Sequence, residues 1–189
     1  MCIRDRPWTY LAFNNIQPLL AETGAEVTWR PFLVGGVFNA VNPSVYQARA
    51  EPMDPKIVHN YRWLHEWAQV AGLPLVFPTA HHPVKSVLAM RACCVLEQDQ
   101  PALQHFSKAA FDAYFARGEN IDEPDVIQAI ADDCGLDGAS LISGTAEQSI
   151  KALMDCSAVP LINDAPSRPQ SSAIAWMTSG SSMFSPRAK

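Results

Sequence analysis

The sequence predicts a mixed α/β protein in which one strand is followed by a long block of helices. Residues 26–29 alternate polar and apolar side chains, as a half-buried strand does. Residues 55–153 instead repeat apolar side chains at helical spacing. Beyond this block, residues 159–162 are the only apolar run long enough for another strand, so we expect the rest of the sheet to be poorly represented.

A helix is expected before the strand, over residues 8–21. Five apolar side chains suggest that this helix is amphipathic: Tyr10, Leu11, Ile16, Leu19 and Leu20. Pro18 lies inside this helix, and Gly24 follows it where a helix end is expected. The strand covers residues 26–33, and its ladder ends at Pro31 because proline has no N–H to donate. Gly35 and Gly36 then permit a sharp bend or the close approach of a ligand.

The helical block contains five expected helices. The first repeats apolar residues from Ile57 to Ala71 and ends at Gly72, and an extended, proline-containing connection follows over residues 73–83. Further helices are predicted over residues 84–97, 102–116 and 146–153. Another covers residues 122–133, with Asp122 as its N-terminal cap and acidic residues suiting the positive end of its dipole.

Composition excludes several classes of function. The chain has 189 residues, enough for one core with a subdomain, and a net charge of -5. No stripe of lysine and arginine is present to neutralise phosphates, so we expect no nucleic-acid partner. No apolar run approaches the roughly 20 residues that a membrane helix needs, and the first six residues contain no apolar signal core. We therefore expect a cytoplasmic protein.

The cysteines and histidines do not predict a metal or redox centre. Five cysteines are an odd number without a recognisable disulfide framework, which suits reduced thiols. Cys93 and Cys94 are adjacent in a helical pattern, and we expect them to be buried packing residues. His81 and His82 are also adjacent, so they point apart in an extended chain, and no metal site is expected. The aromatic helix around residues 61–67 suits either a pocket wall or ordinary core packing.

Several short motifs in order along the chain resemble one enzyme family. These are residues 7–12 (PWTYLA), 30–38 (RPFLVGGVF), 55–56 (PK), 67–68 (WA), 72–74 (GLP), 83–87 (PVKSV), 89–91 (AMR) and 113–115 (AYF), with Gly118, Ile121, Pro124 and Val126. Their order and spacing resemble the 2-hydroxychromene-2-carboxylate isomerases, which are relatives of kappa-class glutathione transferases and DsbA oxidoreductases. The resemblance covers roughly residues 7–155.

The resemblance implies a fold and a division into domains. The family has a thioredoxin-like fold with an all-helical domain inserted after its second strand. Residues 1–38 and 151–189 would then form the thioredoxin-like part, and residues 39–150 the helical insertion. This chain is expected to lack the first strand and the C-terminal strands, because residues 1–6 are not apolar and the similarity fades after about residue 156.

The resemblance also implies a reaction. In this family glutathione binds at the N-terminus of the first helix, where the helix dipole and free N–H groups favour the thiolate. The thiolate adds to the unsaturated, ring-opened substrate, permits rotation about the former double bond, and leaves. We therefore expect a glutathione-dependent cis-trans isomerase of aromatic hydrocarbon degradation, with a small aromatic substrate and, as in the family, a homodimer.

The implied site residues come from three segments. Pro7 and Trp8 stand at the thiol end of the glutathione site, Asn42 resembles a glutathione-contacting asparagine, and Pro55 with Lys56 matches the next binding segment. Lys56 is expected to pair with the substrate carboxylate. The family's serine, which hydrogen-bonds the glutathione sulfur, is replaced by Arg6, and a family lysine is replaced by Asn39.

These departures leave alternatives open. We expect residues 1–6 to be a truncation or assembly artefact in place of the native strand and serine, and the divergent tail to reflect a frameshift. An arginine cannot reproduce the short contact of a serine hydroxyl. The alternatives are therefore a non-catalytic thioredoxin-like module that binds glutathione or another ligand, and a kappa-like transferase or DsbA-like oxidoreductase.

Overall fold

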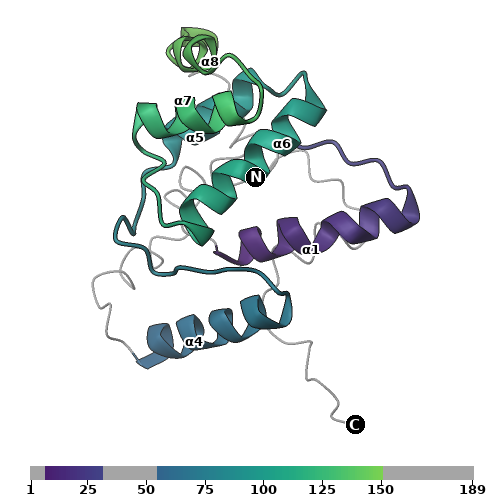
Figure 1. The fold of residues 1–189 in the computed structure, drawn as a ribbon, viewed down its shortest axis with the longest axis vertical. Helices are drawn as coiled ribbons and strands as arrows, with labels where there is room; N and C mark the ends of the chain where they lie inside the picture. Colours follow the sequence, from purple (N-terminus) through teal and green to yellow (C-terminus); the bar gives the residue numbers. More distant parts are fainter. Residues whose placement is uncertain (1–6, 32–54, 151–189) are drawn as a thin grey trace, which may run out of the picture.

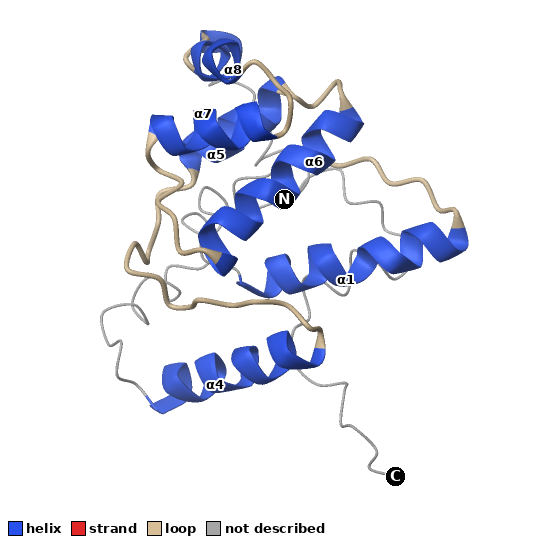
Figure 2. Ribbon diagram, viewed as in Figure 1, coloured by secondary structure: helices blue, strands red, loops and turns tan. Residues whose placement is uncertain are grey.

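The computed structural model describes residues 7–31 and 55–150 (Figure 1). Every regular element within these residues is a helix, and Figure 2 shows no strand among them. The elements are α1 (Pro7–Thr23), α4 (Pro55–Val70), α5 (Val87–Val95), α6 (Gln100–Phe111), the π-helical turn η1 (Asp112–Ala116), α7 (Pro124–Asp133) and α8 (Gly138–Thr145). None of the described helices is both long and apolar enough to cross a bilayer.

The strand expected at residues 26–33 is not a strand in its described part. Residues 24–31 form no ladder with the other described residues. Instead, the side-chain amide of Gln100 accepts a hydrogen bond from the Trp29 N–H at 2.6 Å and donates one to the Trp29 carbonyl oxygen at 3.1 Å. A strand is defined by pairing with a second strand. Here a glutamine side chain satisfies the main chain in place of that second strand.

The first two helices lie where the sequence predicts them, although Leu19, one of the apolar residues that predicted the first, is exposed. Helix α1 contains Pro18 and ends before Gly24, and α4 ends before Gly72. Both glycines have positive φ, 65° and 66°, which a residue with a Cβ adopts only at a cost. The segment expected to be extended, residues 73–83, contains no helix, and its Phe77–Pro78 and His82–Pro83 peptide bonds are cis.

The later helices differ from prediction in their ends. Helix α6 begins at Gln100 because the Asp99 carboxylate caps it, accepting from the Ala102 N–H at 3.1 Å. Asp122 is not the cap of α7, so that prediction is wrong: Glu123 occupies the cap position, and the Asp122 N–H bonds to Asn120 Oδ1 at 3.3 Å.

Two further differences lie near the end of the described chain. Helix α8, over residues 138–145, was not predicted, and of the helix expected over residues 146–153 only residues 148–150 are helical among those described.

Helix α1 and the helical block share one hydrophobic core. The rings of Tyr10 and Phe13 on α1 contact Phe111 and Phe115, with centroids 5.3 Å apart for both Tyr10–Phe115 and Phe13–Phe111. In Figure 1, α1 lies between α4 and α6, and α5, α7 and α8 gather at the other end. The division of the chain at residues 38 and 150 stays a prediction.

Candidate functional site

The start of α1 is the first part of the candidate site. Pro7 is buried and occupies the first helical position, where its fixed φ suits a helix and its missing N–H costs nothing. The first turn of α1 contains no acidic residue. The partial positive charge of its N–H groups is therefore not compensated from within this turn, and it favours an anionic group placed there.

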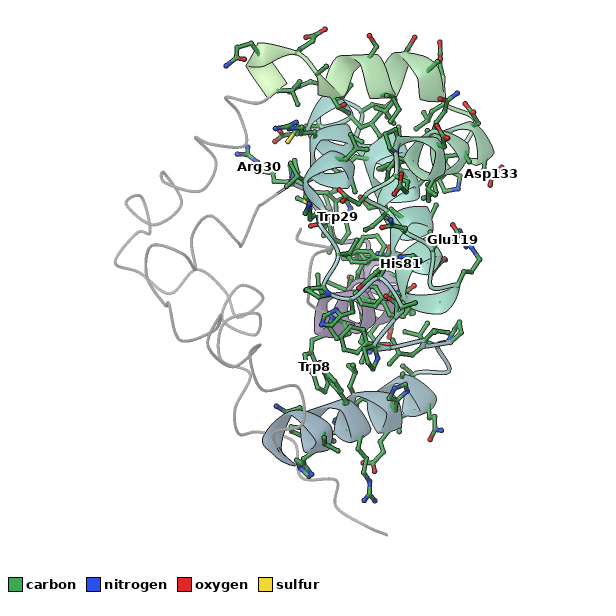
Figure 3. The ribbon with its side chains drawn as sticks, turned by 90° about the vertical axis from the view of Figure 1, so that its left-hand side faces the viewer. Trp8, Trp29, Arg30, His81, Glu119 and Asp133 are labelled. Carbon is green, nitrogen blue, oxygen red and sulfur yellow. The ribbon has the colours of Figure 1, made fainter. Side chains whose placement is uncertain are left out.

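Trp8 connects the start of α1 to α4. Its indole meets that of Trp63 edge to face, with the ring centroids 5.8 Å apart and the planes at 71°. Figure 3 shows Trp8 in the space between α1 and α4. The exposed fractions of Trp8 and Trp63 are 44% and 46%, so both rings keep much of their surface open despite this contact.

The structure describes some of the predicted site residues. Pro7 and Trp8 lie at the start of α1, and Pro55 and Lys56 open α4, whose contacts with α1 bring the two predicted binding segments onto neighbouring helices. The side chains of Pro55 and Lys56 are outside the described part. Arg6 and Asn42 lie outside the described residues altogether, so their predicted roles stay predictions.

Tyr10, which belongs to the motif of residues 7–12, fixes the position of α1. It has no exposed surface, and its hydroxyl donates to the carbonyl oxygen of Pro74 at 3.1 Å. Burial, and then the charge of Asp112, raise the pKa of Tyr10 to about 12. Tyr10 therefore stays protonated at neutral pH, and it ties α1 to the segment that follows α4.

Three histidines lie in the same connecting segment or against it. His65 Nε2 lies 2.7 Å from the carbonyl oxygen of Phe77, and His82 Nδ1 lies 3.3 Å from the Tyr114 hydroxyl. His81 is exposed. Within the described residues, no three histidine, cysteine or acidic side chains gather closely enough to hold a metal ion.

The described thiols are poorly suited to nucleophilic or redox chemistry. Cys93 and Cys94 are buried in the core, as predicted. Burial raises the pKa of each thiol to about 11, so the reactive thiolate is scarce at neutral pH. Burial also raises the pKa of Cys134, with a smaller effect from the charge of Asp133.

A cleft lies away from the start of α1. It is an open cleft of about 520 Å³ between α6, η1 and α7, with four carboxylates on its walls: Asp112, Glu119, Asp125 and Asp133. Arg117 lines it too, but its Nε is paired with Glu119 at 2.5 Å. In Figure 3 Glu119 and Asp133 lie on the side of the molecule opposite Trp8. This acidic surface repels carboxylates and thiolates, and the start of α1 is the better place for an anion.

The sequence did not assign a role to Trp63 or Gln100. Trp63 belongs to the aromatic stretch of residues 61–67, for which a pocket wall and core packing were both open. Its pairing with Trp8 could not be read from spacing, since the two residues are far apart in the chain. The pairing of Gln100 with a main-chain segment likewise has no sequence signature.

Comparisons with known proteins identify the fold. A family model for the DsbA-like thioredoxin domain matches residues 6–157. A solved 2-hydroxychromene-2-carboxylate isomerase is similar with a TM-score of 0.72 and 19% identity, over 86% of this chain and 77% of that chain. At this identity the similarity shows the fold alone. No curated protein matches this sequence.

The fold predicted from the sequence is confirmed by these findings. It is a DsbA-like thioredoxin fold, and its described part is helical without strands, in keeping with a helical insertion. The family model spans most of the chain, including the start of α1 and the helical block. The chain therefore belongs to the DsbA-like thioredoxin-domain family.

Proposed function

We propose that this protein binds glutathione at the start of α1 and uses its thiolate to catalyse cis-trans isomerisation of an unsaturated aromatic acid of the 2-hydroxychromene-2-carboxylate type. The thiolate would add to the conjugated double bond, leave a single bond free to rotate, and then depart with the double bond restored. The cycle consumes no oxidant or reductant. In this proposal the protein acts in the cytoplasm on products of aromatic hydrocarbon degradation.

The observation that carries the proposal is the acid-free first turn of α1, opened by a buried proline. Free N–H groups and the helix dipole at such a place lower the pKa of a bound thiol. The likeness in fold to a 2-hydroxychromene-2-carboxylate isomerase supports the choice of reaction. Pro7 and Trp8 would line the thiol end of the site, and Asn42, Pro55 and Lys56 would complete it.

Among the residues that the structure describes, the thiol groups argue against a DsbA-like oxidoreductase. Such enzymes need an accessible cysteine with a lowered pKa. Cys93 and Cys94 are buried, and burial raises the pKa of each to about 11. A reaction that borrows the thiol of glutathione does not need a reactive cysteine in the protein.

A second candidate is a glutathione-binding module without catalysis. Arg6, at the position of the family's serine, favours it, because a guanidinium attracts a thiolate but cannot make the same short hydroxyl contact. Both candidates predict glutathione binding. They differ in turnover, and in the response to restoring the serine.

The test measures isomerisation of 2-hydroxychromene-2-carboxylate by absorbance, with glutathione, with S-methylglutathione and with neither. We expect a rate with glutathione alone, because S-methylglutathione has no thiol to ionise. Arg6→Ser should raise kcat by about tenfold or more, the value of one charge-stabilising contact. Arg4→Ser, a matched change two residues away, should leave kcat unchanged.

The outcomes separate the candidates. Glutathione binding without turnover, in both the native chain and Arg6→Ser, would establish the non-catalytic module. A rate equal with and without glutathione would exclude the proposed mechanism, since a thiolate adduct could then not be an intermediate.

A further inference from the structure

We propose that Trp63 is a specificity residue, which together with Trp8 binds the flat ring of an aromatic carboxylate. This inference rests on the proposed function, since it names a wall of the same site. Trp8 was assigned to the glutathione site from the sequence, but nothing had assigned Trp63. The structure brings the two indoles together from α1 and α4.

The Trp8–Trp63 pair differs from the other described tryptophans. Trp29 and Trp67 are partly buried and pack against the hydrophobic core, whereas Trp8 and Trp63 are 44% and 46% exposed. Each indole leaves nearly half of its surface exposed. Exposing large apolar surface to water costs free energy, which is why such side chains are usually buried. Their mutual contact covers only part of that surface.

The angle between the two rings suits a planar ligand. Their planes meet at 71°, so the two indoles form a corner rather than a stack. A flat aromatic ring that stacks on one indole therefore presents its edge to the other. Offset stacks and edge contacts are the favoured arrangements of aromatic rings, and an aliphatic group of the same size gains neither.

The charges around the pair suit an anion. The first turns of α1 and α4 contain no acidic residue, although the whole chain carries a net charge of -5. Glu66, one helical turn from Trp63, is paired with Arg62 at 3.0 Å. Lys56 stands seven residues before Trp63, about two turns along the same helix. A carboxylate on the aromatic ring would therefore meet no unpaired acid on these two turns or at Glu66.

The test measures binding of 1-naphthoate, which is flat and anionic but has no double bond to isomerise, by calorimetry. Cyclohexanecarboxylate has the same charge without the flat ring. We expect 1-naphthoate to bind and cyclohexanecarboxylate to bind at least about fivefold more weakly, since aromatic contacts contribute about 1 kcal/mol beyond buried area. Trp63→Ala should weaken 1-naphthoate by about tenfold, and Trp63→Phe should restore part of the loss.

Two controls separate recognition from packing. Val70→Ala removes another exposed apolar side chain seven residues further along α4 and should leave 1-naphthoate binding unchanged. Glutathione affinity should be the same in Trp63→Ala and in the native protein. In turnover, Trp63→Ala should raise KM for the aromatic substrate and leave kcat nearly unchanged, which a general loss of structure would not do. Trp63→Phe keeps a ring at this position, so the comparison stands even where Trp63→Ala folds poorly.

The result that would overturn this inference is equal binding of 1-naphthoate by Trp63→Ala, Trp63→Phe and the native protein, or no binding by the native protein. Failure of the proposed function looks different. In that case 1-naphthoate binds through Trp63, but no glutathione-dependent isomerisation is seen.

Discussion

The hydroxyl of Tyr10 donates a hydrogen bond to the carbonyl oxygen of Pro74, 64 residues further along the chain and 3.1 Å away. This bond joins the first helix to the segment after α4, and the ring of the same tyrosine stacks on Phe115 at 5.3 Å. The start of α1 is therefore held in place from inside the molecule.

Tyr10→Phe should destabilise the protein by about 1 kcal/mol, because the part-buried hydrogen bond to the Pro74 carbonyl oxygen is lost while the ring packing remains. Urea unfolding followed by circular dichroism measures the change. Tyr10→Ala should cost about 3 kcal/mol or more, since it also removes the ring from the core. A Tyr10→Phe variant as stable as the native protein would show that this hydrogen bond does not hold α1.

Stability should fall at alkaline pH. Burial raises the pKa of the Cys93 and Cys94 thiols from 9.0 to about 11, and that of Tyr10 from 10.0 to about 12. Each raised pKa means that the folded state holds its proton more tightly than the unfolded state. The contribution of these protonated groups to the free energy of unfolding is therefore complete below pH 9, and it is lost as the pH rises from about 9 to 12.

Urea unfolding at several pH values measures this loss. Each group should contribute up to about 1.4 kcal/mol per pH unit between its two pKa values. Cys93→Ala should make the decline between pH 9 and 11 shallower, because one of the titrating groups is gone. A free energy of unfolding that is the same at pH 8 and pH 11 would contradict the burial of these groups.

Gln100→Ala should release the chain around Trp29. The substitution removes the acceptor for the Trp29 N–H and the donor for its carbonyl. We expect a loss of about 1 to 3 kcal/mol and faster hydrogen exchange at the Trp29 amide. Gln98→Ala, at an exposed glutamine two residues earlier, is the control and should change neither quantity. Equal exchange at Trp29 in both variants would show that Gln100 does not fix this segment.

Gly138→Ala should disturb the packing of α8 on α7. A Cβ at residue 138 would lie 2.6 Å from the Gln128 carbonyl oxygen and 2.7 Å from Asp132 Oδ1, closer than carbon and oxygen can approach. The expected cost is about 1 to 3 kcal/mol. Gly144→Ala is the matched change in the same helix, where the nearest atoms belong to the Val95 side chain at 3.3 Å. It should cost less, and the reverse order in thermal unfolding would contradict this packing.

The sequence predicted helices well where a buried stripe and a terminating glycine coincide. Leu64 and Ala68 of α4 are buried as their spacing required, and Gly72 ends the helix with positive φ. Helix α8 was missed because its glycines and serines are weak helix formers. Its stability comes from packing on α5 and α7 and from Asp137, which caps the Ser140 N–H at 2.9 Å.

The candidate site could be predicted only in part. Pro7 and Trp8 were identified because they belong to a recognisable motif at a helix start, and the structure places them there. Trp63 belongs to no recognisable motif, and it meets Trp8 only because α4 packs beside α1 in the folded chain. The expected strand at residues 26–33 failed in its described part because alternation shows which side chains suit a strand but not which group will pair with its main chain.

The most direct test of the central claim is a titration of the thiol of bound glutathione by its thiolate absorbance in the ultraviolet. If the start of α1 stabilises the thiolate, the pKa of bound glutathione should lie at least about one unit below that of free glutathione. Arg6→Ser should retain or increase this shift. A bound thiol that titrates at the same pH as free glutathione would contradict thiolate binding at α1, and with it the proposed isomerase.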